Sequence, residues 1–487
     1  FFALGGHSLL AAQVVGQLRR LFTVELSLST FFEGPTVAEL ARRVVANGPQ
    51  TRPTSTRVPA DQRVFASWGQ RRMWAPDRIH GPGHSAHIAR IHTIDGPLDL
   101  DALERALVAL EERHDALRTC FELDGEHRYG PPLLRLEQPR SSILEHRTTP
   151  PGREWVPLDL SREHPWRACV WPSSEHRWGL ALAAHHAAVD GLSFATASRD
   201  LETLYHGFAT GDATDGALPT LGAGYRDFAA WQARCIEEGS WKDQLAWWRE
   251  TLAGLPPLAR ARLPEAGEAS GLAGTVTRPL PPDLLSALRR RARAVGATEF
   301  MVLLTAWVAT LRRCTGQLDF AVITPVGAVV EPTMQGVVGM FLNRVLLRCD
   351  CGGSTTLQQL LERMRDVTLG ALAHGEPPHE EVLAALDPDS HGRAQLDGRA
   401  QLAVSFNLTE LSGMQLQLPG LRCKTSSWPR HKTSFDLALY AVSRAGAYEW
   451  VLVHDRGLLS TAGAETLLAE VERALAELVA APHSPAS

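Results

Sequence analysis

The sequence contains very little lysine. Of its 49 lysines and arginines, only Lys242, Lys424 and Lys432 are lysine, which leaves 46 arginines. Because arginine codons are rich in GC and lysine codons in AT, this bias predicts a bacterial gene of high GC content. Positive charge is not in excess either, since 54 acidic side chains give a net charge of −5 at pH 7. We therefore expect no nucleic-acid partner and no polybasic membrane-binding surface.

Long apolar runs and cysteine motifs are absent as well. The longest apolar run, residues 300–311, is too short to cross a bilayer and predicts a buried helix instead. The seven cysteines form no CxxC pair and no metal-ligand spacing, and their odd number is typical of a reducing compartment. These absences predict a cytoplasmic protein without a membrane segment or a metal site. Position 1 is not Met, and no leader pattern follows it, so we expect an excerpt of a longer protein.

The 487 residues exceed the usual size of a single core, and the composition, 44% hydrophobic and 21% charged, is that of a globular protein. Residues 1–46 predict a helical segment, in which Thr36 and Glu39 form a capping box, and residues 47–62 predict an extended linker. The remainder alternates strands and helices, which predicts two α/β units. The clearest elements expected are helices at 101–114, 192–208, 299–313 and from 464 onward, strands at 119–123, 180–184 and 320–324, and a polar loop at 387–401.

The sharpest local pattern is His185-His186-Ala-Ala-Val-Asp190-Gly191. If the preceding strand continues through both histidines, their side chains point to opposite faces, so that one can reach a substrate while the other faces the core. A neutral imidazole can accept or orient a proton near pH 7. We expect Asp190 to lie in the turn, held by an arginine, and Gly191 to allow a tight backbone into the next helix. Taken alone, the pattern also fits a buried histidine pair with a helix-capping Asp, whereas a metal site would need a further ligand.

Ser8 stands at the start of an apolar periodic stretch, directly after Leu4-Gly5-Gly6-His7. A serine in that place is most often a helix N-cap. The same place also favours an attached phosphate, because free N–H groups and the helix dipole point at it. No neighbouring base would make Ser8 a hydrolytic nucleophile.

Seven segments, taken in order, resemble the motifs of one family. Residues 1–10 are similar to the phosphopantetheine attachment motif of peptidyl carrier domains. The rest of the chain resembles a condensation domain of a nonribosomal peptide synthetase over essentially its whole length. The matching motifs are residues 67–74, 113–121, 185–191, 225–231, 338–343 and 377–380.

The resemblance implies an α/β fold of two chloramphenicol-acetyltransferase-like lobes in a V, at 63–235 and 236–487. A partial all-α carrier bundle at 1–46 precedes them and lacks its first helix. The active site would lie in a tunnel between the lobes, open to a donor carrier on one face and an acceptor carrier on the other.

The resemblance also assigns roles to individual residues. Ser8 would carry a covalent 4′-phosphopantetheine arm, and His186 would face the tunnel. His185 and Asp190 would be structural members of the catalytic motif, and Gly191 would lie beside the reacting centre. Structural support would come from three further motif residues, Arg113, Arg118 and Trp231.

Arg344 departs from the family pattern, which usually has threonine after the asparagine of the fifth motif. Two interpretations stay open for this bulky cation. It reaches the tunnel, or it pairs with a carboxylate such as that of Asp190. The seventh motif, around residues 399–408, is barely recognisable.

The implied reaction is peptide-bond formation, in which the α-amine of an acceptor aminoacyl thioester attacks a donor acyl thioester. The implied partners are a downstream acceptor carrier, an upstream adenylation domain of the same module and a phosphopantetheinyl transferase. One alternative is an epimerization domain, which shares the histidine motif, although residues 339–343 look more like the condensation version. Another is a non-catalytic recruitment domain of the same fold, a class that tends to lose the second histidine.

Overall fold

The structure is a computed structural model that describes residues 14–486 in part. It leaves out residues 1–13, 16–17, 19–20, 23, 25, 27–29, 32–33, 35, 47–55, 60, 83–86, 124–129, 213–215, 259–266, 328–331, 353–354, 387–402, 411–414, 429–431, 445 and 487. Ser8 with its motif and the expected polar loop at 387–401 therefore lie outside the described residues.

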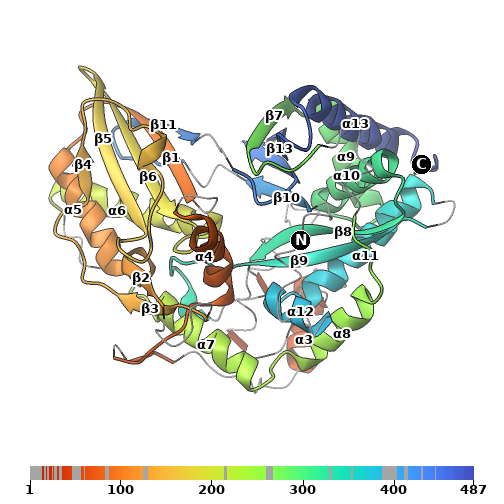
Figure 1. Ribbon diagram of the computed structural model, residues 1–487, viewed down its shortest axis with the longest axis horizontal. Coiled ribbons are helices and arrows are strands. Elements are labelled where there is room, and N and C mark those ends of the chain that lie inside the picture. The colour runs from red at the N-terminus through yellow and green to blue at the C-terminus, as the bar shows by residue number, and fades with distance from the viewer. Residues whose placement is uncertain are drawn as a thin grey trace.

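Two α/β lobes stand side by side in a V-shaped outline (Figure 1). The N-lobe is built on a five-stranded sheet with the order β11-β1-β6-β5-β4. Its strands are β1 (His87–Asp95), β4 (Leu144–His146), β5 (Trp166–Ser174), β6 (Arg177–His185) and β11 (Arg422–Ser427). A two-stranded sheet pairs β2 (Thr119–Glu122) with β3 (Leu133–Leu136). The helices are α4 (Trp68–His80), α5 (Leu100–Arg113), α6 (Gly191–Thr210) and α7 (Tyr225–Glu237), with short 3-10 turns η2 (Asp115–Arg118) and η3 (Arg153–Trp155).

Helices α5 and α6 cover one face of the N-lobe sheet. Leu103, Leu107 and Leu110 recur at helical spacing on α5 and are buried against strands β1, β5 and β6. Asp99 caps this helix by accepting a hydrogen bond from the N–H of Ala102 at 2.9 Å. The expected helices at 101–114 and 192–208 and strands at 119–123 and 180–184 are confirmed, with ends shifted by one to three residues.

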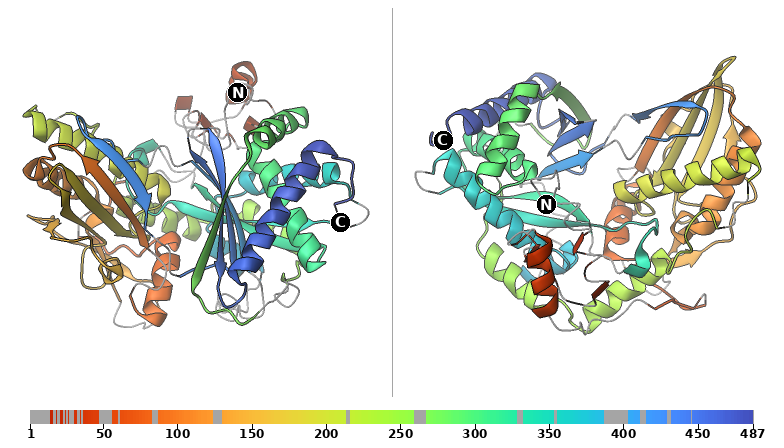
Figure 2. Two further views of the ribbon diagram at one scale, coloured as in Figure 1. Left: turned by 90° about the horizontal axis from the view of Figure 1, so that it is seen from above. Right: turned by 180° about the vertical axis from the view of Figure 1, so that it is seen from behind.

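The C-lobe is built on a six-stranded sheet with the order β7-β13-β12-β10-β8-β9. Its strands are β7 (Ala273–Pro279), β8 (Asp319–Gly327), β9 (Leu342–Asp350), β10 (Val404–Glu410), β12 (Leu437–Arg444) and β13 (Ala447–Asp455). Its helices are α8 (Lys242–Leu252), α9 (Pro282–Ala294), α10 (Glu299–Thr315), α11 (Leu357–Ala373), α12 (His379–Leu386) and α13 (Thr461–Ala480), with the 3-10 turn η5 (Pro332–Met334). Figure 2 shows α13 along the face of this sheet that looks away from the N-lobe.

Helix α10 is the centre of the C-lobe core. Its run from Met301 to Leu311 is buried, as the apolar stretch predicts, and it packs with α9, α11 and α13 against one face of the sheet. The helix begins at the N-cap Thr298, which accepts from the N–H of Met301, and ends at Gly316 with a φ of 65°. No single described helix is long and apolar enough to span a membrane; α9 and α10 pass such a test only as a pair, and they meet at 106°.

Strand β11 crosses from the C-terminal half of the chain into the N-lobe sheet. It pairs antiparallel with β1, so that Arg90 lies opposite Ser427 and Asp95 opposite Arg422, and Figure 2 shows it beside the N-lobe strands. Leu416 and Leu418, which precede it, are buried in the N-lobe core. The boundary between the lobes that the sequence predicts, at 235/236, is therefore incomplete, because the N-lobe also contains this later segment.

The described part of the carrier segment packs against the C-lobe. Val15, Val24, Leu26, Phe31 and Leu40 form a small apolar cluster that contacts Leu372 of α11. Helix α3 (Val37–Ala46) begins after Thr36, whose hydroxyl accepts from the N–H of Glu39 at 3.2 Å, as the capping box predicts.

The end of the linker is bound along α7. The N–H of Val58 donates to Asp227 at 2.7 Å, and the guanidinium of Arg226 donates to the carbonyl of Gln62 at 2.8 Å. The linker is therefore anchored to the lobes at its C-terminal end.

His92 lies at the β1–β11 pairing and gives this part of the fold a pH dependence. The side chain is fully buried, and its Nδ1 lies 2.9 Å from the hydroxyl of Thr425 on β11. Burial, with a smaller effect from Arg90, lowers the pKa of His92 to about 3. Because an unfolded histidine titrates near pH 6.5, its contribution to stability is complete above that pH and is lost as the pH falls toward 3.

When the pH falls from 7 to 5, we expect the free energy of unfolding of His92→Asn to decrease by about 2 kcal/mol less than that of the wild type. Urea denaturation at both pH values measures this difference. His206→Asn, at an exposed position on α6, is the matched control and should follow the wild type. Equal pH dependence of all three proteins would show that His92 is not held neutral in the fold.

Candidate active site at the junction of the lobes

Strand β6 ends at His185, and the two histidines of the motif lie in different environments. Between residues 181 and 190, His186 alone is partly exposed, whereas its neighbours are buried. The expectation that one imidazole is accessible while the other faces the core matches this placement. The strand does not continue through His186, so the separation arises from the turn that follows β6 and not from strand alternation.

His185 is locked by two hydrogen bonds. Its Nε2 lies 2.8 Å from the carboxylate of Asp77 on α4, and its Nδ1 accepts from the N–H of Ala187 at 3.0 Å. Because a backbone N–H can only donate, the ring carries its proton on Nε2 and donates it to Asp77. Both nitrogens are thereby engaged, which holds the backbone just before His186 in one conformation.

His87 completes a buried cluster with Asp77 and His185. Its ring meets that of His185 edge-on at 4.9 Å, and its Nε2 accepts from the N–H of Leu158 at 3.0 Å. Burial, together with His185, lowers the pKa of His87 to about 3, so this ring is neutral at pH 7. The ligand atoms of the three residues lie within 4.8 Å of one another, a spacing that could also hold a metal ion. The hydrogen bonds already formed account for the arrangement without one.

Asp190 joins the histidine turn to the C-lobe. Its carboxylate accepts from the N–H of Ser193 at 2.8 Å, which caps α6, and from the N–H of Phe341 at 2.8 Å. Its own N–H donates to the carbonyl of Gly339 at 3.1 Å. The expectation that an arginine holds Asp190 is wrong: within the described residues its partners are backbone and Ser193 groups, which supply donors without a second charge.

Ser193 strengthens the same junction. Its hydroxyl donates to the carbonyl of Gly339 at 2.7 Å and lies 3.1 Å from the N–H of Gly339. Burial raises the pKa of Asp190, and the hydrogen bonds from Ser193 and Phe341 oppose that rise. Gly191 is the first residue of α6, directly between Asp190 and the exposed Leu192.

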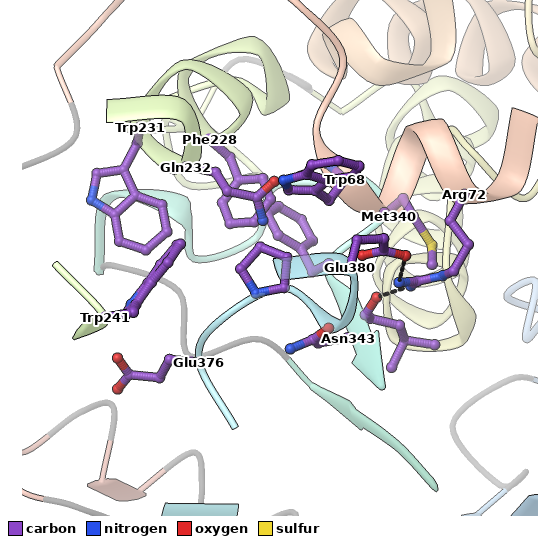
Figure 3. Close-up of a pocket in the computed structure, with 14 residues that line it drawn as sticks. Trp68, Arg72, Phe228, Trp231, Gln232, Trp241, Met340, Asn343, Glu376 and Glu380 are labelled. Carbon is purple, nitrogen blue, oxygen red and sulfur yellow. Dashed lines mark hydrogen bonds and ion pairs between the residues drawn. The ribbon is translucent and has the colours of Figure 1, made fainter. Parts of the chain in front are cut away.

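An aromatic cluster, here called the aromatic joint, lies between the lobes and lines a small pocket (Figure 3). Trp68, Phe228, Trp231 and Trp241 line a pocket together with residues 340–343. Its cavity volume of about 30 Å³ leaves room for only one or two water molecules, so we regard it as part of the joint and not as a substrate site.

Arg72 makes the polar contact of the joint. Its guanidinium forms an ion pair with Glu380 at 3.0 Å and donates to the carbonyl of Leu342 at 2.8 Å. Tyr225 adds a second link, since its hydroxyl donates to the carbonyl of Met340 at 2.6 Å and lies 2.7 Å from that of Ser67. The first, fourth, fifth and sixth motifs thus meet in space.

The three residues expected to support the fold all make structural contacts. Arg113 forms an ion pair with Asp200 at 2.8 Å and donates to the carbonyl of Pro219. Arg118 donates to the carbonyl of Glu137 at 2.6 Å, and Trp231 is buried edge-on against Trp241 with ring centroids 6.2 Å apart.

Arg344 lies on β9 and does not pair with Asp190. Its guanidinium stands over the ring of Phe435, 5.0 Å from the centroid, and it has no ion pair within the described residues. Of the two interpretations of this residue, pairing with Asp190 is excluded.

Sequence reasoning missed Asp77, which lies 108 residues before its partner His185. A signal was present, since Gln70, Trp74 and Asp77 recur at helical spacing and are the buried residues of α4. An acidic residue on the apolar face of a helix calls for a buried partner. Ser193 and the N–H of Phe341 were also missed, and a backbone donor leaves no signal in a sequence.

We expect Asp190→Ala to lower the free energy of unfolding by about 2 kcal/mol or more, because it leaves the N–H groups of Ser193 and Phe341 without their acceptor. Asp366→Ala on α11, whose side chain is 66% exposed, removes the same group from the surface and should change stability by less than about 0.5 kcal/mol. Chemical denaturation compares the two. Equal effects would mean that Asp190 does not hold the lobes together.

Comparison with known proteins places these features in a family. The family model described as a condensation domain matches residues 61–487, and the one described as a phosphopantetheine attachment site matches residues 1–44, which contain Ser8. A probable non-canonical nonribosomal peptide synthetase, CymA, from Salinispora arenicola (strain CNS-205) is 32% identical over 500 residues, which cover 99% of this chain and 6% of that protein. Malpinin synthetase from Mortierella alpina is 30% identical over 457 residues, which cover 90% of this chain and 6% of that protein.

Among solved structures, the complex of the X-domain and OxyB from teicoplanin biosynthesis matches with a TM-score of 0.76 and 23% identity, over 90% of this chain and 98% of that chain. At that identity the match shows the fold alone. The chain spans only about one-sixteenth of the two curated relatives named above. Since the family model covers most of its length, the chain belongs to the condensation-domain family of nonribosomal peptide synthetases and carries a phosphopantetheine attachment site at its N-terminal end.

Proposed function

We propose that this chain forms a peptide bond between two carrier-bound substrates. The α-amine of an acceptor aminoacyl thioester attacks the carbonyl of a donor acyl thioester, an amide bond forms, and the donor thiol leaves. The observation that carries the proposal is the placement of His186. It is the partly exposed residue of a buried turn that Asp77, through His185, and Asp190 hold from two sides.

His186 acts on the acceptor amine. A free α-amino group has a pKa of about 8, so most of it is protonated at pH 7 and only modest help is needed to make it a nucleophile. We propose that His186 positions the amine, takes part in proton transfer and stabilises the charge that develops in the transition state. His185 and Asp190 position this histidine without touching substrate, and Gly191 leaves the turn narrow beside the reacting atoms.

Ser8 is the proposed attachment point for 4′-phosphopantetheine, which, when bound, presents an acyl group as a thioester. We propose a phosphopantetheinyl transferase as the enzyme that modifies it. Because the carrier precedes the condensation domain in the same chain, we propose it as the donor, and a separate downstream carrier as the acceptor. Tethering both substrates raises their local concentration, so rate and specificity depend on carrier docking as well as on the pocket.

The wider assignments rest on composition and on the relatives. We propose that an adenylation domain of the same module loads the carrier, as the synthetase names of the relatives suggest. The preference for arginine over lysine supports a bacterial source. None of the seven cysteines, all of which are described, forms a disulfide, which supports a reducing compartment such as the cytoplasm.

The two alternatives have less support. A recruitment domain would share the fold, as the X-domain does, but the fold match does not distinguish the functions and His186 is present. An epimerization domain would share the histidine motif. Exchange of the α-proton of a loaded amino acid with solvent deuterium would be its signature, which we do not expect here.

We expect His186→Ala to reduce the single-turnover rate of condensation by about a hundredfold or more, with both carriers loaded, because the group that positions the amine is lost. Quenched-flow measurement of the dipeptidyl product on the acceptor carrier gives the rate. His206→Ala, at an exposed position on α6, is the matched control and should match the wild type.

Ser8→Ala separates the chemistry from loading. This variant should fail to load its own carrier and yet condense a donor supplied on a separate carrier.

Wild-type single-turnover rates in His186→Ala would contradict the histidine-centred mechanism.

A further inference from the structure

Arg344 lies on the face of the C-lobe sheet that is turned toward the histidine motif. Its strand neighbours Val345 and Leu347 are buried in the helix-covered core, so Arg344 points to the opposite face. On that face Phe435 and Tyr440 form a separate cluster with Ala438. The stacking of Arg344 on Phe435 places the guanidinium on this side of the sheet.

Strand pairing brings this face close to the catalytic turn. Arg344 lies opposite Pro325 on β8, and Gly327 is two residues further along the same strand, about 7 Å away. A Cβ built on Gly327 would lie 3.7 Å from the side chain of Leu192, which follows Gly191 directly. The cation and the histidine turn therefore border the same region between the lobes.

Polar groups extend from Arg344 across the sheet. Ser405 on β10 pairs in parallel with Ile323 on β8, and Asn407, two residues further along β10, pairs with Tyr440 on β12. Val404 and Phe406 are buried in the helix-covered core, so Asn407 points to the same face as Arg344 and Tyr440, and this face carries a guanidinium, an amide and a phenol.

The positive charge of Arg344 has no counterpart in the described residues. The nearest carboxylate to influence it, that of Glu380, already forms an ion pair with Arg72 at 3.0 Å. Glu381, which follows Glu380 in the chain, accepts from the indole of Trp68 and faces Arg71. Among the described residues, these two carboxylates are therefore already engaged by Arg72, Trp68 and Arg71.

The charge persists at neutral pH although the surroundings oppose it. Burial, with a smaller contribution from Arg72, lowers the pKa of Arg344 to about 9, so the group stays protonated at pH 7. Burial with Arg344 and Arg72 nearby also lowers the pKa of His379 to about 4, which keeps that imidazole neutral. An enclosed cation without a paired anion is costly, and an anionic group from outside would relieve the cost.

We propose that Arg344 binds a carboxylate on one of the two carrier-bound substrates and thereby selects for an acidic side chain in the peptide. The inference rests on the proposed condensation function and names the substrate class that this site accepts. A guanidinium can form two parallel hydrogen bonds with a carboxylate, which an isosteric carboxamide cannot match.

The test compares acidic and amide substrates of the same shape. Carriers are loaded with aspartyl or asparaginyl residues, and with glutamyl or glutaminyl residues, first as donor against alanyl acceptor and then as acceptor against alanyl donor. In one of these arms we expect the wild type to favour the acid over the amide by about tenfold or more in kcat/KM. The arm that shows the preference identifies which substrate bears the carboxylate.

Arg344→Thr, which restores the residue usual in the family, should reduce that preference to less than about twofold, mainly by slowing the reaction of the acidic substrate. Arg344→Lys keeps the charge without the fork and should fall between the two. Arg444→Thr, at the end of β12 where the side chain is 54% exposed, is the matched control and should keep the wild-type preference.

Equal rates for acid and amide in both arms of the wild type would overturn the inference while leaving condensation itself intact. An equal loss with every substrate in Arg344→Thr would also overturn it, because the residue would then serve the fold or the carrier arm. Absence of product with any substrate pair in the wild type would contradict the proposed function itself.

Discussion

The hydrogen bonds of Asp190 are the constraint on which the rest of this structure depends. One carboxylate caps α6 in the N-lobe and accepts from the N–H of Phe341, at the start of the C-lobe strand β9. Ser193 and Gly339 bond to each other in both directions beside it. Because these donors are neutral, the buried carboxylate is held without a second charge, and the histidine turn is fixed to both lobes at once. Asp190 thus both caps a helix and joins the two lobes.

The same junction explains why motifs far apart in the chain belong together. Arg72 of the first motif contacts Glu380 of the sixth and the backbone of the fifth, and Tyr225 of the fourth reaches Met340. These contacts connect the two lobes, while the pair of Asp77 and His185 fixes the end of β6. His186 is the partly exposed residue of the turn, and the contacts around it hold its imidazole in one position. In the proposed function, the chemistry that this imidazole performs is modest, because tethering brings the two substrates together.

Local sequence patterns predicted the helices and strands well, but they could not predict which strands pair across long distances in the chain. Helix α10 was expected at 299–313 and lies at Glu299–Thr315, because a capping box and an apolar run define it. Strand β11 could not be assigned to the N-lobe, since it is polar and pairs with a strand more than 300 residues earlier. The difference in burial between His185 and His186 was expected from the motif, whereas the partner of Asp190 was not. An expected arginine was replaced by a backbone N–H, which every residue except proline possesses.

The central claim is that an acyl group moves from the carrier arm on Ser8 to the amine of a separate acceptor. Intact-protein mass spectrometry tests it most directly, with an isotopically labelled acyl group loaded on Ser8 and an aminoacylated acceptor carrier added. The account predicts that the labelled mass leaves this chain and appears on the acceptor as an amide that survives thioester cleavage. Label retained on Ser8, with the amino acid from the added carrier joined to it there, would contradict the direction of transfer.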